Sequence, residues 1–370
     1  MKIGVPRERK VMEFRAGMIP DGARQLCAAG HEVRVESGLG LGCGIADEAY
    51  VAAGARVVSV DEVWASDLVV KVKEPQADEI GFLHERLVLF TYLHLAAAPA
   101  VATALQKSGA IGIAYETIRH PDGSFPVLAP MSEVAGRLAV QIGVTLLQKD
   151  RGGKGLLLGG VPGVMRGKVT VLGAGTVGIN AARVANALGA EVDVLDLDLK
   201  RLTYLYDIFR GELNTLFSNP VNIERSVLSS DLVIGGVYVS GRRAPTLVTE
   251  AMVRAMDPGS VVADVAVDQG GCVETIHPTT HADPTYIVHD VIHYGVANMP
   301  GAVPRTATFA LTNVTLPYID RIAELGIEEA VRREPALRHG ANVWRGDIVC
   351  EGVAESLELP YRDLGEIVTL

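Results

Sequence analysis

Three glycines in the segment VLGAGTVG have the spacing of a nucleotide-binding turn. Gly173, Gly175 and Gly178 form the pattern G-x-G-x-x-G. In a chain with 40 glycines such a hexapeptide occurs easily by chance. Here, however, an apolar strand pattern precedes it, a helical pattern follows it, and the next strand pattern ends at Asp196, 18 residues after Gly178. This order of strand, turn, helix and acidic residue is typical of dinucleotide binding.

Each part of this pattern has a physical role. The first glycine permits a tight turn, the second lets backbone N–H groups approach a pyrophosphate, and the third lets the helix pack closely on the strand. Asp196 would accept hydrogen bonds from the adenosine ribose and would repel a 2′-phosphate, so the sequence favours NAD over NADP. Lys200 and Arg201 argue mildly against this preference. In the alternative interpretation, Asp196 and Asp198 are only solvated residues at the end of a strand.

Several polar side chains follow apolar segments elsewhere in the chain. Lys71 and Lys73 close the segment DLVVKVKEP, His94 follows LVLFTYL, and Asp268 follows SVVADVAV. Arg15 lies in EFRAGMIP, shortly after the first predicted strand. Ligands of open α/β sheets bind at the carboxyl ends of the strands, so these residues are candidates for a substrate site.

Each candidate also has a purely structural interpretation. A lysine that alternates with valines usually lies on a solvated face, and only one of Lys71 and Lys73 need point inward. The histidine could be a core residue, the aspartate a turn cap and the arginine a surface residue. Together, however, two cations can hold a carboxylate, and a histidine can move the proton that accompanies hydride transfer. A carboxylate can orient water or the imidazole, so the set suits oxidation of an α-amino or α-hydroxy acid.

The elements that must position these residues alternate between strand and helix. This rhythm over the first ~125 residues predicts βαβ units and a parallel sheet. The segment 131–148 then keeps a helical period over about five turns, with Ser132 as a plausible N-cap and Glu133 favourable in the first turn. A second alternating series begins at the glycine motif. We therefore expect an α/β fold with two doubly wound Rossmann-like domains with parallel sheets, linked by long helices.

The change near residue 130 from alternating strands and helices to one long helix also predicts the domain boundaries. Residues 1–129 plus 300–370 are expected to form a substrate-binding and catalytic domain, and residues 130–299 an NAD-binding Rossmann domain. The C-terminal stretch is too short to bury a core of its own, so it should pack back onto the first domain.

Composition excludes several classes of function. The 370 residues are 48% hydrophobic, enough to bury a full core in two or three domains. The net charge is −10 and no block of Lys or Arg stands out, which argues against nucleic acid as a partner. No apolar segment suggests a signal peptide or a membrane span, so we expect a cytoplasmic protein. The four cysteines are scattered without a C-x-x-C pair, which argues against a metal site and against disulfides.

Over nearly its whole length the chain resembles the NAD-dependent alanine dehydrogenases of bacteria, within the alanine dehydrogenase/transhydrogenase N-terminal superfamily. The similar segments are GVPRE, EFRAGMIP, LVVKVKEP, FTYLHLAA, AYET, LAPMSEVAGRLA, GGVPGV, VLGAGTVG, VLDLD, VAVDQGGC, VHDVIHYGVANMPGAVPRT and TNVTLPY. Blocks of this length and order are highly specific.

The resemblance implies roles for the polar residues. Arg15 and Lys73 would hold the substrate carboxylate, while Lys71 has no implied role. His94 and Asp268 would be the catalytic pair, in which the histidine exchanges a proton with the carbonyl or imine. The carboxylate would help to activate or orient ammonia and water.

The resemblance also implies a cofactor site. Besides the glycines, the implied NAD contacts are Ser132, Thr176, Val177, Asp196, Arg201, Ser218, Val237, Val265, Ala266, Val267, Val296, Ala297, Asn298 and Met299. One departure is His277, because family members usually carry arginine there. This departure could change cofactor affinity and should not change the chemistry.

The implied reaction converts L-alanine, NAD and water reversibly into pyruvate, ammonium and NADH through an imine. Hydride transfer requires a closed cleft that controls water, so closure of the two domains about the segments near 130 and 300 is expected. The family forms homohexamers, which makes a homo-oligomer the implied assembly.

Three other interpretations are open. The soluble NAD-binding component of proton-pumping transhydrogenase has a similar fold and glycine motif, but it needs no amino-acid site. A second alternative is a dehydrogenase of another amino acid, of the lysine or saccharopine type. The third is an NAD-sensing protein with a dead site. The intact set of Arg15, Lys73, His94 and Asp268 argues against the first and the third.

Overall fold

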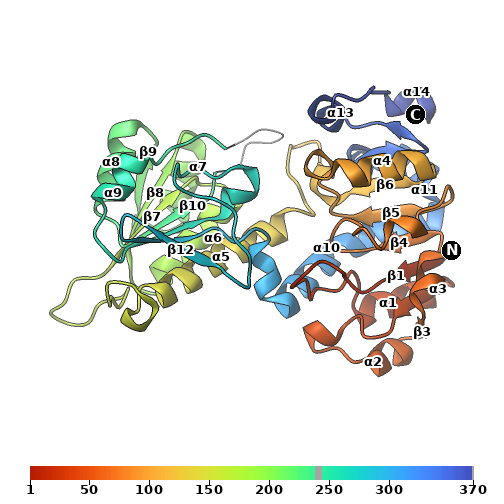
Figure 1. Ribbon diagram of the computed structural model, residues 1–370, viewed down its shortest axis with the longest axis horizontal. Helices are drawn as coiled ribbons and strands as arrows, with labels where there is room; N and C mark the ends of the chain where they lie inside the picture. Colours follow the sequence, from red (N-terminus) through yellow and green to blue (C-terminus); the bar gives the residue numbers. More distant parts are fainter. Residues whose placement is uncertain (238–243, 369–370) are drawn as a thin grey trace. The chain divides into compact units, whose positions relative to one another are not determined.

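The computed structural model describes residues 1–237 and 244–368, which form two compact units. Unit 1 contains Met1–Met131 and Val303–Leu370, and unit 2 contains Ser132–Ala302. Each unit is built on its own sheet (Figure 1). The predicted α/β class with two doubly wound, mostly parallel sheets is confirmed.

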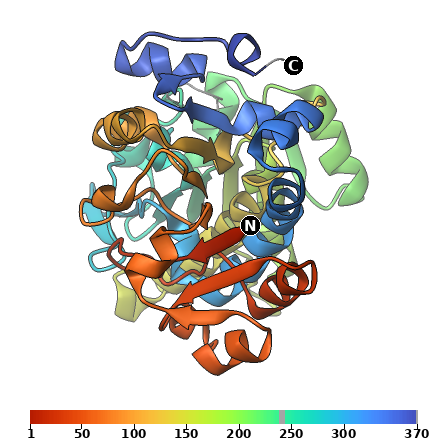
Figure 2. The same ribbon diagram turned by 90° about the vertical axis from the view of Figure 1, so that its right-hand side faces the viewer.

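The sheet of unit 1 has the strand order β15-β14-β6-β5-β4-β1-β2-β3. Its strands are β1 (Lys2–Val5), β2 (Glu32–Glu36), β3 (Arg56–Val58), β4 (Leu68–Val70), β5 (Val88–Thr91), β6 (Ile111–Ala114), β14 (Ala341–Trp344) and β15 (Asp347–Ile348). The first six are parallel, whereas β14 pairs antiparallel with both β6 and β15. In Figure 2, which faces unit 1, the red strand β1 lies inside the sheet and not at its edge.

Both faces of this sheet are covered. The helices of unit 1 are α1 (Pro20–Ala28), α2 (Asp47–Ala52), α3 (Val60–Trp64), α4 (Pro99–Ser108), α10 (Pro304–Leu325), α11 (Ile327–Arg333), α12 (Pro335–Gly340), α13 (Glu351–Leu357) and α14 (Leu364–Ile367). Leu68 and Val70 belong to one core cluster and Val69 to another. Because successive side chains of a strand point to opposite faces, the central strands are apolar on both faces and read as continuous apolar segments.

The sheet of unit 2 has the order β12-β13-β11-β10-β7-β8-β9. Its strands are β7 (Lys168–Leu172), β8 (Glu191–Asp196), β9 (Asn214–Phe217), β10 (Leu232–Gly235), β11 (Val261–Asp264), β12 (Thr285–Val288) and β13 (Val291–Tyr294). Only β12 is antiparallel among these strands. The helices are α6 (Thr176–Ala187), α7 (Leu199–Ile208), α8 (Pro220–Leu228) and α9 (Glu250–Ala255), together with most of α5 (Ala129–Leu146).

Two local predictions were wrong. Helix α5 begins at Ala129, so Ser132 lies inside its first turn and is not the N-cap, and Glu133 comes after that turn. The apolar period of residues 131–148 correctly indicated the body of the helix. The helix itself begins three residues before Ser132. Strand β4 ends at Val70, so Lys71 and Lys73 follow the strand and are not part of it.

Within the described residues, no helix combines the length and the apolar character needed to cross a bilayer. Cys27, Cys43, Cys272 and Cys350 are all free thiols.

Candidate functional site

Both sheets have a point at which the strand order reverses direction. In unit 1 it lies between β1 and β4, and in unit 2 between β7 and β10. The connections after these neighbouring strands leave towards opposite faces of the sheet, which opens a crevice at the carboxyl ends. The loops after β1 and β4 carry Arg15, Lys71 and Lys73, and the loop after β7 carries the glycine motif. Arg15, Lys71 and Lys73 in unit 1 and the glycine motif in unit 2 therefore follow strands at these reversal points, whereas His94 follows β5 and Asp268 follows β11.

At two of the three motif positions, the fold itself requires glycine, whether or not a ligand binds. Gly173 has φ +99°, and a Cβ there would lie 2.9 Å from the carbonyl oxygen of Gly236 in the neighbouring loop. A Cβ on Gly178 would lie 1.8 Å from the carbonyl oxygen of Gly173. No side chain fits either position, so these glycines let the turn form and let α6 pack against β7.

Gly175 is different, because the fold does not require it. Its φ is −78°, which any residue adopts, and it directly precedes α6. Among the described residues, only Nη1 of Arg201 lies within 4 Å of a Cβ at this position, at 3.9 Å. A side chain here would occupy open space beside the positive end of α6. A glycine in this place therefore fits a phosphate that must approach the backbone N–H groups closely, as the pyrophosphate of a dinucleotide does.

Asp196 closes β8 and holds the glycine turn. Its Oδ2 accepts the backbone N–H of Ala174 at 2.6 Å and its Oδ1 accepts that of Asp198 at 2.8 Å. The side chain is 12% exposed, and Arg201 approaches it at 3.9 Å. The alternative interpretation of Asp196 as a solvated strand end is therefore wrong. Its contact with a ribose stays a prediction.

Most of the other predicted cofactor contacts also follow the carboxyl ends of strands in unit 2. Ser218 follows β9, Val237 follows β10, Val265, Ala266 and Val267 follow β11, and Val296, Ala297, Asn298 and Met299 follow β13. Thr176, Val177 and Arg201 lie on the helices after β7 and β8, and Ser132 is half-buried on α5. Their role in binding a dinucleotide stays a prediction. His277, the departure from the family pattern, is exposed and stacks on Tyr286 with ring centroids 3.8 Å apart.

The segment before Asp268 is not a strand beyond Asp264. Strand β11 ends at Asp264, and Val265–Gln269 forms a 3-10 helix that carries an exposed Asp268. Asp264 is fully buried, and its carboxylate accepts the backbone N–H groups of Ala266 at 2.8 Å and Cys272 at 2.7 Å. These bonds turn the chain out of the sheet. Burial raises the pKa of Asp264, while the N–H donors act against that rise.

In unit 1, both lysines of KVKEP are buried, so the alternative interpretation of a lysine on a solvated face is wrong for each of them. Lys71 is 0% exposed, and its Nζ lies 2.8 Å from Oε1 of Glu79 and 3.3 Å from Oε2 of Glu8. Lys73 is 9% exposed, and its backbone N–H donates to Glu8. Lys71 is therefore part of a buried ion network in the core.

Arg15 is held by a bidentate ion pair. Its Nε and Nη2 donate to the two carboxylate oxygens of Glu13 at 2.7 and 2.6 Å, and Nη1 lies 3.2 Å from the sulfur of Met131. Both charged side chains are almost fully buried. Burial by itself lowers the pKa of Arg15, but the contacts with Glu13 outweigh it and raise the pKa. The guanidinium is therefore charged and fixed in its plane.

His94 follows β5 in a strained backbone conformation, with φ 46°. The carboxylate of Glu116 accepts the backbone N–H groups of His94 at 2.6 Å and Leu93 at 3.3 Å, and it lies 3.9 Å from Nδ1 of the imidazole. The ring stacks in parallel on Tyr92, with centroids 5.7 Å apart, and is 44% exposed. Strain of this kind persists only where neighbours fix the residue, and it is frequent at functional sites.

Three of the four predicted substrate and catalytic residues lie in one region of unit 1. Burial raises the pKa of Tyr92, and the nearby charge of Arg15 opposes that rise. Tyr92 in turn stacks on His94. Glu8, whose carboxylate accepts the backbone N–H of Lys73, also raises the pKa of Arg15 through its negative charge. Asp268 belongs to unit 2, and its participation with the other three stays a prediction.

Sequence reasoning missed the acidic and aromatic residues that hold the chain near the candidate residues within each unit. They are Glu8, Glu13, Tyr92 and Glu116 in unit 1 and Asp264 in unit 2. A weak signal for Glu8 and Glu13 was their position in the charged segment between the first strand and Arg15. Nothing in that segment indicates that its carboxylates are buried.

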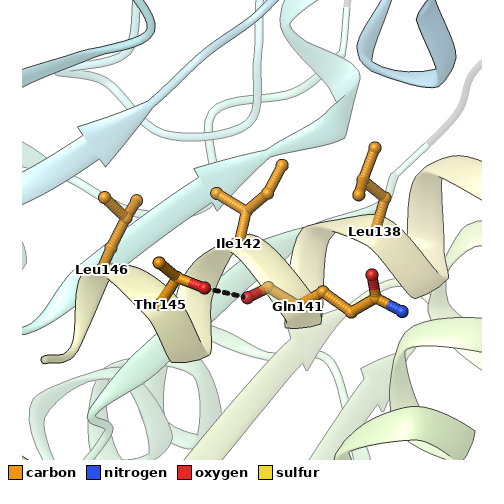
Figure 3. A pocket seen from close by; sticks show the side chains of 5 residues that line it. All are labelled: Leu138, Gln141, Ile142, Thr145 and Leu146. Carbon is orange, nitrogen blue, oxygen red and sulfur yellow. Dashed lines mark hydrogen bonds between the residues drawn. The ribbon is translucent and has the colours of Figure 1, made fainter. Parts of the chain in front are cut away.

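A hollow in unit 2 is lined by none of the candidate catalytic or substrate-binding residues. It measures about 280 Å³ and lies along α5, where Leu138, Ile142 and Leu146 project from one side of the helix (Figure 3). The remaining lining residues are Gln141 and Thr145, so no charged group reaches it. In the described part of the chain there is also no cluster of three or more His, Cys, Asp or Glu residues that could hold a metal ion.

Comparisons with known proteins agree with the resemblance found in the sequence. The profile described as "Alanine dehydrogenase/PNT, N-terminal domain" matches residues 4–135, and its C-terminal counterpart matches residues 139–351. The chain is 54% identical to the alanine dehydrogenase of Bacillus subtilis (strain 168) over 363 residues, which cover 98% of this chain and 96% of that protein.

Solved structures give the same result. A structure titled "L-alanine dehydrogenase" superposes with a TM-score of 0.94 at 50% identity and covers 97% of this chain and 99% of that one. A transhydrogenase from Sinorhizobium meliloti superposes with a TM-score of 0.82 at 24% identity, covering 94% of this chain and 100% of that one, and shows a shared fold. The chain therefore belongs to the alanine dehydrogenase/PNT family.

Proposed function

We propose that this chain is an NAD-dependent alanine dehydrogenase. It interconverts L-alanine, NAD⁺ and water with pyruvate, ammonium, NADH and a proton. The observation that carries the proposal is that Arg15, Lys73 and His94 gather at the carboxyl ends of β1, β4 and β5 in a chain half identical to an alanine dehydrogenase. Two cations and a histidine are what a small keto acid requires for binding and for proton exchange.

In this proposal Arg15 and Lys73 bind the substrate carboxylate. Glu13 fixes the plane of the Arg15 guanidinium, so little side-chain entropy is lost when a carboxylate binds to it. Lys73 is held through its backbone and adds a second positive charge. Together the two cations fix the acid end of the substrate and thereby the position of its second carbon.

His94 exchanges the proton in this proposal. Its ring is partly exposed, so a substrate can reach it, while Tyr92 stacks on the ring and Glu116 holds the backbone N–H of His94. In the direction of amination it donates to the carbonyl oxygen of pyruvate as ammonia adds, and in the reverse direction it accepts that proton. Asp268 is assigned to orienting ammonia and water, as the family resemblance implies.

The glycine turn, Asp196 and Arg201 would hold the dinucleotide. Bound NAD supplies the hydride acceptor for the hydrogen on the second carbon of alanine. The residues of this chain contribute the N–H groups at the start of α6, the open space beside Gly175 and the carboxylate of Asp196. Unit 2 is accordingly proposed as the NAD-binding domain, and unit 1 as the substrate and catalytic domain.

Three finer properties are also part of the proposal. They are a homohexameric assembly, a cytoplasmic location, and L-alanine, pyruvate and ammonium as the physiological small-molecule partners. Their support is the resemblance to the family.

The decisive assay is the consumption of NADH in the presence of pyruvate and ammonium. We expect activity with this mixture and none when ammonium is left out. Activity without ammonium would indicate a hydroxy-acid dehydrogenase. Activity with 2-oxoglutarate and none with pyruvate would indicate a dehydrogenase of another amino acid, and no activity with any keto acid would favour a transhydrogenase-like binding protein.

Asp196→Ala should weaken the preference for NADH over NADPH. The carboxylate repels a 2′-phosphate, so its removal should raise the ratio of kcat/KM with NADPH to that with NADH by about tenfold, or ~1.4 kcal/mol. Steady-state kinetics with both cofactors measure this ratio. Asp207→Ala, which removes an exposed carboxylate from α7, serves as the control. An equal loss with both cofactors would show that Asp196 only supports the glycine turn.

A further inference from the structure

A buried charge network lies directly beside Lys73 and has no part in the chemistry described above. Its members are Lys71, Glu8 and Glu79, whose side chains are 0%, 2% and 1% exposed. The two carboxylates lie 3.3 and 2.8 Å from the Lys71 ammonium group. The carboxylate of Glu79 also accepts the backbone N–H of Gln76 at 2.9 Å.

Stability alone does not account for this network. Taking three charges out of water is costly, and well-packed apolar residues in their place are often equally stable or more stable. The Lys71 ammonium group lies 5.9 Å from the ring centroid of Trp64, which is buried with Val69 in the second core cluster, so an apolar side chain at position 71 would extend that core. What a network of this kind provides beyond an apolar core is a fixed direction for its hydrogen bonds.

Those hydrogen bonds act on the backbone of Lys73. Oε1 of Glu8 accepts the N–H of Val72 at 2.7 Å, and Oε2 accepts the N–H of Lys73 at 3.3 Å. On the other side, the hydroxyl of Thr91 donates to the carbonyl oxygen of Lys73 at 3.0 Å. Beyond the end of β4 at Val70, Lys71 still donates its N–H to Phe90 and Val72 still accepts the N–H of Tyr92. At Lys73, the carboxylate of Glu8 and the hydroxyl of Thr91 bind the backbone N–H and carbonyl oxygen.

Glu8 can hold both N–H groups only while it is ionised. A protonated carboxyl group has an O–H that would face one of the two donors. Burial raises the pKa of Glu8, and the charge of Lys71 acts in the opposite direction. Burial likewise lowers the pKa of Lys71, but the two carboxylates outweigh it and raise the pKa. The lysine therefore stays charged beside Glu8.

We propose that Glu8 is a positioning residue for Lys73 and that Lys71 is its buried counter-charge. The inference rests on the proposed role of Lys73 as a ligand of the substrate carboxylate. Glu8 itself touches no substrate in this account. It fixes the point from which the Lys73 side chain extends, so its loss should weaken substrate binding and leave cofactor binding unchanged.

Glu8→Gln is the primary test. It leaves the Lys71–Glu79 pair intact, and the amide can accept only one of the two N–H groups because its NH₂ faces the other. We expect KM for pyruvate to rise by about tenfold, the factor for one lost hydrogen bond to a charged group, with KM for NADH within about twofold. Lys71→Met should raise KM for pyruvate similarly, and Lys71→Arg, which retains the charge, should restore most of the affinity.

Lys154→Met is the matched control. Lys154 is also a lysine held by two carboxylates, Asp231 at 2.7 Å and Asp257 at 3.2 Å, but it lies in unit 2. This variant should lower the unfolding temperature without changing KM for pyruvate. A rise of KM for pyruvate in Glu8→Gln no larger than in Lys154→Met would overturn the proposal. A fall in kcat with an unchanged KM for pyruvate would also overturn the proposal, because a residue with a merely structural role changes only the amount of folded enzyme.

Hydrogen exchange separates this proposal from the proposed function. The amides of Val72 and Lys73 should exchange faster in Glu8→Gln than in the unsubstituted protein, measured by mass spectrometry on a peptide that spans them. Accelerated exchange supports the positioning role even if pyruvate proves not to be the substrate. Unchanged exchange refutes it even if the enzyme proves to be an alanine dehydrogenase.

Discussion

Lys73→Ala should strongly lower turnover with pyruvate and ammonium while NADH still binds. Truncating one partner of a buried charge pair typically costs about 2–5 kcal/mol, so kcat/KM for pyruvate should fall roughly 30- to 5,000-fold. The cofactor is assigned to the other unit, so its dissociation constant should change by less than about twofold. Steady-state kinetics measure the first quantity, and the fluorescence titration of NADH measures the second.

The matched control is Lys107→Ala, which removes an exposed lysine from α4 in the same unit. It should leave both quantities unchanged. If Lys73→Ala lost NADH binding together with turnover, the lysine would be a structural residue, and the proposed carboxylate site would have to be abandoned.

Gly175→Val should weaken cofactor binding without disturbing the fold. The backbone at this position accepts any residue, and the space beside it is open apart from Arg201, within the described residues. A phosphate that packs against the glycine would meet the new side chain, and overpacking of this kind costs about 1–3 kcal/mol. NADH should therefore bind roughly 5- to 150-fold more weakly, as measured by titration, while the unfolding temperature stays close to that of the unsubstituted protein.

Two other glycines define the controls for this experiment. Gly81→Val adds the same side chain at an exposed position where no described atom lies within 4 Å of a Cβ, and it should affect neither property. Gly178→Val should destabilise unit 2, because its Cβ would lie 1.8 Å from the Gly173 carbonyl oxygen. NADH affinity that is unchanged in Gly175→Val would place the pyrophosphate elsewhere.

Most of the fold was predictable because its signals are local. The central strands are buried on both faces and therefore appear as continuous apolar segments such as KVTVL and VVAD. Right-handed crossovers leave few ways to connect such strands and the helices between them. The glycine turn was predictable for the same reason, since Gly178 packs against Gly173 within a single βαβ unit. The contact of Gly173 with Gly236 lies outside that unit.

Errors occurred where the bounds of an element do not follow the local apolar pattern. Lys71 continued the pattern of its strand, but β4 ends at Val70, and the N–H of Val72 donates to the carboxylate of Glu8, which precedes Lys71 by 63 positions. The predicted N-cap at Ser132 was wrong because the helix begins at Ala129. The strand predicted up to Val267 ends at Asp264, whose buried carboxylate binds the backbone at Cys272.

The sequence by itself determined the α/β architecture, the dinucleotide turn and the family, since these depend on short-range periodicity and on the order of residues in long segments. Only the tertiary structure decided which charges are buried and paired: Lys71 with Glu8 and Glu79, Arg15 with Glu13, and His94 beside Glu116. The physical reason is that the free energy of a buried charge depends on the distance to its partner in space, and spacing along the chain does not contain that distance.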